Sequence, residues 1–317
     1  MRIRNNQLNK LSKALQSTFS LICLVAFVAT WQLSPARAQT DLPPELLGTP
    51  VIEPSTAADA GTPTPSLSPE EQDAISAIAE KQRLESEIVI VLQTYRGQLE
   101  TYRNLEKEYD IAYDVFLSTP TLVAIDNAVS ATRAVIVSRT DVLKTYLELL
   151  RLRLTATEGI EITIKEKTLN KLELYIEELE KYGSVAQGAQ NRDGVNLAVS
   201  YFTDLGKGVE IAASEAQGLI VLGRLQSSYD QSQVIQRELQ FRFPEDKRTP
   251  AQSRSMEQIA VALADADALL KVALTDLQTQ ALKGTFDDFY RDRVRVLNPA
   301  YAKLSRVNAY QAELLTL

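Results

Sequence analysis

The chain of 317 residues carries 34 basic and 41 acidic side chains, no histidine and a single cysteine, Cys23. Residues 1–38 hold five of the basic residues and no acid, so the rest of the chain is more acidic than the overall formal charge of −7. This balance argues against nucleic acid or anionic lipid as a partner. The missing histidine excludes Ser-His-Asp and Cys-His catalytic groups, and one cysteine cannot form an internal disulfide. Carboxylate chemistry, lysine chemistry and oxygen-ligated cations remain open. We predict a protein that is not an enzyme and that uses no cofactor or metal.

The N-terminus has the three-part layout of a signal peptide. A basic start over residues 1–13 is followed by an apolar run from Phe19 to Ala29 and by the small-x-small exit Ala36-Arg37-Ala38. The apolar run is shorter than the roughly 20 residues that span a bilayer. We predict cleavage after Ala38, which places the remaining chain outside the cytoplasm, either in the periplasm or secreted. An uncleaved membrane anchor is the alternative.

Residues 39–67 have the composition of a disordered linker. They contain six prolines and four acids, with no basic residue and little apolar surface. Such a segment cannot bury enough apolar area to offset the entropy of folding. We predict an extended tether between the signal peptide and a domain that covers residues 68–317.

Helix start signals divide this domain. Ser68-Pro69-Glu70-Glu71 is a capping box with proline at the first helical position, and it predicts a helix over 69–117. Thr119-Pro120 repeats the start signal and predicts an antiparallel helix over about 120–157. Thr249-Pro250 predicts a third start.

Glycines and proline predict where the helices end. Gly159 is expected to stop the second helix, and a break is expected between Gly183 and Gly194. The alternation of Ile160, Ile162 and Ile164 is a strand signal, but a lone strand would have no partner, so we favour a helix start or a connector. Pro299 is expected to kink or restart the last helix, with Asn298 as its cap.

The central helix is predicted from about Gly194 to Leu239. Its apolar residues recur at alternating steps of four and three, the pattern of a helix that lies along its neighbours: Ala198, Phe202, Leu205, Val209, Ala212, Ala216 and Leu219. A similar seam follows the third start: Met256, Ile259, Leu263, Ala266, Leu270, Ala273 and Leu277. The fold prediction is all-α: an elongated antiparallel, coiled-coil-like bundle of five or six helices.

Two short motifs imitate ligand-binding loops. Leu205-Gly206-Lys207-Gly208 lacks the first glycine and the hydroxyl residue of a phosphate-binding loop, so close helix packing is the better interpretation. Asn191-Arg192-Asp193-Gly194 would place Ala189 at the first ligand position of a calcium loop, which favours a turn.

Tyrosines and arginines are the candidate partner-binding residues. Tyr95, Tyr102 and Tyr109 stand one heptad apart on the first helix, where they either pack in a seam or contact a partner. Arg248 and Arg254 could contribute to a basic end of an otherwise acidic domain, together with the basic residues around them and Arg291, Arg293 and Arg295. Acidic pairs such as Asp265/Asp267 are expected on solvated helix faces.

In architecture, the chain resembles helical pore-forming toxins and bacterial coiled-coil envelope proteins. We predict an exported, non-enzymatic protein that mediates assembly or binds a protein partner, or a second copy of itself, through its helical seams. Two alternatives remain: a membrane-active protein that exposes an apolar helix, and a helical sensor that binds a small ligand between its helices.

Overall fold

The computed structural model describes residues 69–280 and 286–316. These residues form six α-helices and one 3₁₀ turn, with no strand in the described ranges. The prediction of an all-α helical bundle is therefore confirmed. The helices are α2 (Pro69–Ser118), α3 (Leu122–Thr155), α4 (Ile162–Gln187), α5 (Arg192–Arg242), α6 (Pro250–Gln280) and α7 (Phe286–Thr316), with η2 (Glu245–Lys247) between α5 and α6.

The chain divides into two units, residues 1–80 and 81–317. The described part of the first unit is the start of α2, and the bundle belongs to the second unit. The predicted signal peptide, the predicted linker and the Ser68 cap lie outside the described residues.

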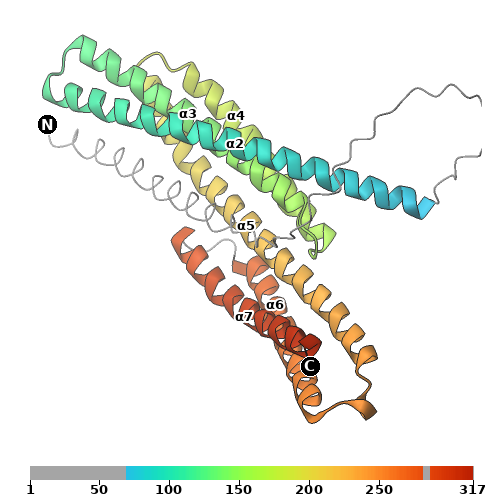
Figure 1. Ribbon diagram of the computed structural model, residues 1–317. Helices are drawn as coiled ribbons and strands as arrows, with labels where there is room; N and C mark the ends of the chain where they lie inside the picture. The colour runs from blue at the N-terminus through green and yellow to red at the C-terminus, as the bar shows by residue number, and fades with distance from the viewer. Residues whose placement is uncertain (1–68, 281–285, 317) are drawn as a thin grey trace, which may run out of the picture. The chain divides into compact units, whose positions relative to one another are not determined.

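Helices α2 and α3 form an antiparallel hairpin, as the sequence predicted (Figure 1). The predicted start of α3 at Thr119-Pro120 is displaced. Thr121 is the N-cap, and its hydroxyl accepts a hydrogen bond from the amide of Ala124 at 3.2 Å. Thr119 instead closes α2, because its amide donates to the carbonyl of Val115 at 2.8 Å. The turn thus uses one threonine for each helix end.

The connection from α3 to α4 turns at Gly159, the described residue with a positive φ of 77°. A side chain there would be strained, which explains why glycine follows the end of α3. The ammonium of Lys165 donates to the carbonyls of Thr155 and Thr157 at the end of α3. Helix α4 begins at Ile162, so the predicted helix start is confirmed and the alternating isoleucines do not form a strand.

The expected break between Gly183 and Gly194 is also confirmed, because α4 ends at Gln187 and α5 begins at Arg192. Asn191 caps α5, and its side-chain oxygen accepts from the amide of Gly194 at 2.9 Å. The segment that resembles a calcium loop is therefore a helix N-cap.

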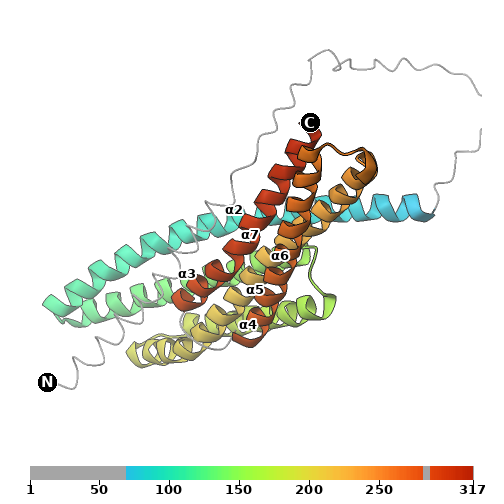
Figure 2. The ribbon, with the colours of Figure 1, turned by 90° about the horizontal axis from the view of Figure 1, so that it is seen from below.

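Helix α5 is the shared element of the bundle. It contacts α3, α4, α6 and α7, while α3 packs on α4 and α6 packs on α7 (Figures 1 and 2). All seven predicted seam residues of α5, from Ala198 to Leu219, are buried. The seven seam residues of α6, from Met256 to Leu277, are buried as well.

Glycines on α5 let its neighbours approach. A Cβ at Gly208 would overlap the ring of Tyr175 on α4, and a Cβ at Gly218 would lie 2.6 Å from a methyl of Leu277 on α6. A Cβ at Gly223 would lie 2.7 Å from the backbone oxygen of Glu158. The segment that resembles a phosphate-binding loop thus lies inside α5, and its Gly208 serves close packing.

Helices α6 and α7 run antiparallel beside α5 (Figure 2). The capping box of α6 is reciprocal: the amide of Gln252 donates to the hydroxyl of Thr249 at 3.3 Å, and the amide of Thr249 donates to the side chain of Gln252 at 3.0 Å.

Helix α7 corrects one expectation. It continues through Pro299, so the predicted restart with an Asn298 cap is wrong. Buried Leu297 and Ala300 flank the proline, and their packing offsets the cost of about 3 kcal/mol that proline brings to a helix interior. Near the end of α7, Leu314 is buried and Leu315 is exposed.

A polar contact between α4 and α5 explains why Glu215 interrupts the apolar surface of α5. Its carboxylate accepts from the ammonium of Lys171 at 2.6 Å and from the hydroxyl of Thr168 at 3.1 Å. Because Thr168 is buried, this contact lies at the helix interface and satisfies a charge that would otherwise be costly there.

Two glycine-to-alanine substitutions should have opposite effects. Gly223→Ala should lower the free energy of unfolding by about 1–3 kcal/mol, because the new methyl meets backbone that cannot move freely. Gly97→Ala on α2 should raise it by about 0.5–1 kcal/mol, since nothing lies within 4 Å of the added Cβ. Urea unfolding followed by circular dichroism measures both. Equal effects would contradict the packing role of Gly223.

Candidate functional site

The tyrosines of α2 point into the bundle to different degrees. Tyr95 and Tyr102 are buried, and Tyr109 is half-buried. The Tyr95 ring lies 5.7 Å from the ring of Tyr146 on α3. The hydroxyl of Tyr102 donates to the Glu106 carboxylate at 3.2 Å. In this structure, therefore, Tyr95 and Tyr102 pack between helices and present no ring to a partner.

A buried arginine next to these tyrosines is a feature that sequence reasoning missed. The guanidinium of Arg139 on α3 lies 3.9 Å from the centre of the Phe202 ring, which is a cation–π contact. Burial lowers the pKa of Arg139, and the nearby Tyr102, Tyr182 and Glu106 oppose that change. The signal was its position on α3, three residues after buried Ile136 and four before buried Leu143.

Burial also changes the titration of the tyrosines. Desolvation raises the pKa of Tyr95, Tyr109 and Tyr182 to about 12, and it raises the pKa of Tyr102 and Tyr146 further. These phenols therefore stay neutral at physiological pH and serve packing, with the buried Tyr146 hydroxyl accepting a hydrogen bond from Gln217.

The two candidate arginines lie near the α5–α6 connection. The guanidinium of Arg248 donates through Nε to the carbonyl of Phe243 at 2.7 Å, so it holds the loop, while Arg254 is exposed on α6. The structure does not bring Arg295 to them: α7 is antiparallel to α6, and its first turns lie beside the end of α6 rather than its start (Figure 2).

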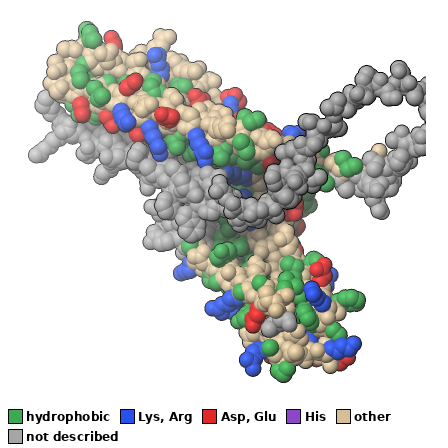
Figure 3. All heavy atoms as spheres, viewed as in Figure 1, with side chains coloured by type: hydrophobic (Ala, Val, Ile, Leu, Met, Phe, Trp, Pro, Cys, Tyr) green, Lys and Arg blue, Asp and Glu red, His purple; other side chains and the backbone are tan. Residues whose placement is uncertain are grey.

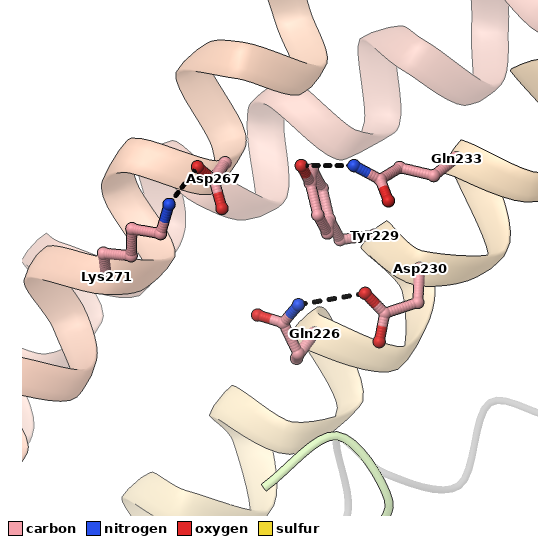
Figure 4. A network of polar contacts seen from close by, with 6 residues as sticks. All are labelled: Gln226, Tyr229, Asp230, Gln233, Asp267 and Lys271. Atoms are coloured by element: carbon pink, nitrogen blue, oxygen red, sulfur yellow. Dashed lines mark hydrogen bonds and ion pairs between the residues drawn. The ribbon is translucent and has the colours of Figure 1, made fainter. Parts of the chain in front are cut away.

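The acidic pair on α6 forms ion pairs. Asp265 accepts from Lys303 on α7 at 2.5 Å, and Asp267 accepts from Lys271 at 2.6 Å. Figure 4 shows the Lys271 ammonium turned toward the Asp267 carboxylate on α6. On α5, the side-chain amide of Gln233 donates to the hydroxyl of Tyr229 at 2.6 Å. Of these contacts, the Asp265–Lys303 pair joins two helices, whereas the Asp267–Lys271 and Gln233–Tyr229 contacts lie within α6 and within α5. Within the described ranges, no group of three acids or cysteines is placed to hold a metal ion.

The surface that stands out is the end of the α2–α3 hairpin, residues 108–132, called here the hairpin tip. It exposes five large apolar side chains, from 48% exposed at Val115 to 80% exposed at Leu122: Ile111, Val115, Leu117, Leu122 and Val123. Figure 3 shows hydrophobic side chains on the surface at this end of the two helices. A group of large exposed apolar side chains at one end of a hairpin is a candidate interaction site.

The hairpin tip is acidic as well as apolar. Its four charged residues are all exposed acids, with no lysine or arginine among residues 108–132: Glu108, Asp110, Asp114 and Asp126. Partial desolvation, and then repulsion from Asp114, raise the pKa of the Asp110 carboxyl. The acids are thus close enough to influence one another, and their field favours a basic partner.

Aromatic contacts support the tip from behind. The rings of Tyr109 and Tyr113 stack at 5.7 Å, and the rings of Tyr113 and Phe116 lie 6.2 Å apart. These rings all belong to α2, and the hydrogen bonds of Thr119 and Thr121 end α2 and cap α3, so the contacts stabilise the two helix ends at the tip. Tyr109 therefore contributes to the tip as a support.

Comparison with known proteins gives no match to a family model, to a curated protein or to a solved structure. Among the helices described, none is long and apolar enough to cross a bilayer.

Alkaline pH should unfold the protein through its tyrosines. A phenol whose pKa is about 12 in the fold and 10.0 when exposed keeps its proton in the fold and loses it on unfolding, so its stability contribution is complete below pH 10.0 and is lost as pH rises towards 12. Each such phenol lowers the free energy of unfolding by up to about 1.4 kcal/mol per pH unit. Urea unfolding across this range measures the slope.

The matched variant is Tyr182→Phe, because phenylalanine keeps the ring and cannot ionise. The slope of its stability against pH should be shallower than that of the wild-type protein. An unchanged slope would show that Tyr182 ionises without opposing the fold.

Proposed function

We propose that this chain is an exported, non-enzymatic helical protein that binds a protein partner through the hairpin tip. The observation that carries the proposal is the group of five large exposed apolar side chains at the hairpin tip, where the charged residues are all acids. A monomer in water gains nothing from five large exposed apolar residues at the end of one hairpin, whereas a binding surface does.

The chemistry of the tip favours a partner with an apolar surface ringed by lysine and arginine. Exposed acids attract basic residues and speed association, while Leu122 and Val123 supply the area that becomes buried. The same acids are repelled by the anionic headgroups of a membrane, so the tip supports protein binding better than the membrane-active alternative.

The absence of enzymatic activity remains part of the proposal. With no histidine and with its cysteine in the predicted signal peptide, the exported chain would have to use carboxylate or lysine chemistry. The acids that the structure places at the helix interfaces instead form ion pairs and hydrogen bonds, as Glu215 does with Lys171.

Export is tested by the mass of the mature protein. We expect the protein recovered from the periplasm or the medium to begin at Gln39, since Ala38 completes the small-x-small exit. Intact mass spectrometry measures this directly. A chain that still begins at Met1 and sediments with membranes would favour the uncleaved anchor.

Partner binding is tested with a tip variant and a matched control. Leu122→Asn with Val123→Asn should abolish capture of the partner from envelope extracts without lowering the melting temperature, because both side chains are exposed. Leu174→Asn, on the exposed surface of α4, should leave capture unchanged. Asp110→Asn with Asp114→Asn should weaken capture at low salt and have less effect at high salt.

Capture of the same proteins by the wild type and the tip variant would refute the proposal. Light scattering of the pure protein tests whether it associates with itself. If the tip variant changes the oligomeric state of the pure protein but captures the same other proteins, the tip pairs two copies of the chain. In that case the prediction of a basic partner is wrong.

A further inference from the structure

A cavity of about 320 Å³ lies where the end of α3 meets the second half of α5. The last turn of α3 contributes Arg153, the following connection contributes Glu158, and α5 contributes Arg224. Lys81 reaches the same cavity from α2. Gly223 allows the connection to lie directly against α5 and so shapes the wall.

The cavity is cationic, although the chain as a whole is acidic. Among the described residues that line it are three basic side chains from three helices and one acid, Glu158. Burial, and then repulsion from Arg224, lower the pKa of Arg153, which agrees with positive charges held close together. An anion in the cavity would relieve this repulsion.

A purely structural role accounts for only part of this charge. Arg153 lies in the last turn of α3, where a cation is favoured by the helix dipole. The dipole does not require two further cations from α2 and α5. None of the ion pairs found among the described side chains involves Lys81 or Arg224.

The other lining residues suit the uncharged, hydroxyl-bearing part of a small organic ligand. Ser227, Ser228 and Gln231 of α5 bring two hydroxyls and an amide, while Ile88 and Ala156 bring apolar surface. The volume lies at the lower end of the roughly 300–1,000 Å³ that small-molecule sites occupy.

We propose that this cavity binds a small organic phosphomonoester. The planar guanidinium of Arg224 matches two phosphate oxygens and the ammonium of Lys81 matches a third, while the hydroxyls of Ser227 and Ser228 hold the organic part. This ligand site is independent of the hairpin tip and of the partner proposed for it.

The test uses the full-length purified protein with glucose 6-phosphate, and with glucose as the uncharged probe. Calorimetry should show binding of the phosphate ester and none of glucose, and the ester should raise the melting temperature. Arg224→Gln should weaken binding at least about tenfold, since a charge-assisted bidentate contact is lost. Arg237→Gln, an exposed arginine further along α5, is the matched control and should bind as the wild type does.

A second readout separates lost binding from lost folding. Because Arg224 repels Arg153, Arg224→Gln should melt no lower than the wild type without ligand. The source of the phosphomonoester is distinguished by sedimentation with vesicles: binding to phosphatidic acid but not to phosphatidylglycerol would place the same group on a lipid, and binding to glucose 6-phosphate alone would place it on a soluble metabolite.

Three results would overturn the proposal. One is the absence of binding to both glucose 6-phosphate and phosphatidic acid. Another is equal loss of binding in Arg224→Gln and Arg237→Gln, which would indicate a diffuse charge effect. The third is unchanged binding in Arg224→Gln.

Discussion

The bundle depends on how closely other helices approach α5. Long helices without a disulfide gain their stability from side-chain packing, and packing is strongest where backbones can come near. Ala198, Ala212 and Ala216 are fully buried on α5, and Gly208 and Gly223 leave space for groups from α4 and from the α3–α4 connection. A single helix can therefore be covered by α3 and α4 along one part and by α6 and α7 along another.

Close approach imposes a second condition, because polar groups that enter these interfaces need partners. The Glu215 carboxylate accepts hydrogen bonds from Lys171 and Thr168 on α4. On the α7 side, the Ser232 hydroxyl contacts Asn308, and the side-chain amide of Gln311 donates to the Ser232 carbonyl at 2.8 Å. Sliding either neighbour by one helical turn would separate these groups. The polar contacts thus fix the register that the small residues leave free.

Two surfaces remain that packing does not explain, and their chemistry is opposite. The hairpin tip is apolar and acidic, and it is supported by the stacked rings of Tyr109 and Tyr113. The cavity beside Gly223 is basic, and it is lined by hydroxyl groups. We propose a basic protein surface as the partner of the first and a phosphate ester as the ligand of the second, which would give the protein two separate binding functions.

The sequence by itself determined the helices, because capping residues, glycines and a seven-residue apolar period act within a few turns of one another. It thus predicted the break between Gly183 and Gly194, the buried seams of α5 and α6, and the hairpin of α2 and α3. Tertiary structure alone decided that Tyr102 is buried, that Pro299 stays inside α7, and that Leu122 is exposed at the tip. It also brought Lys81, Arg153 and Arg224 to one cavity, since residues so far apart in sequence meet only when helices pack.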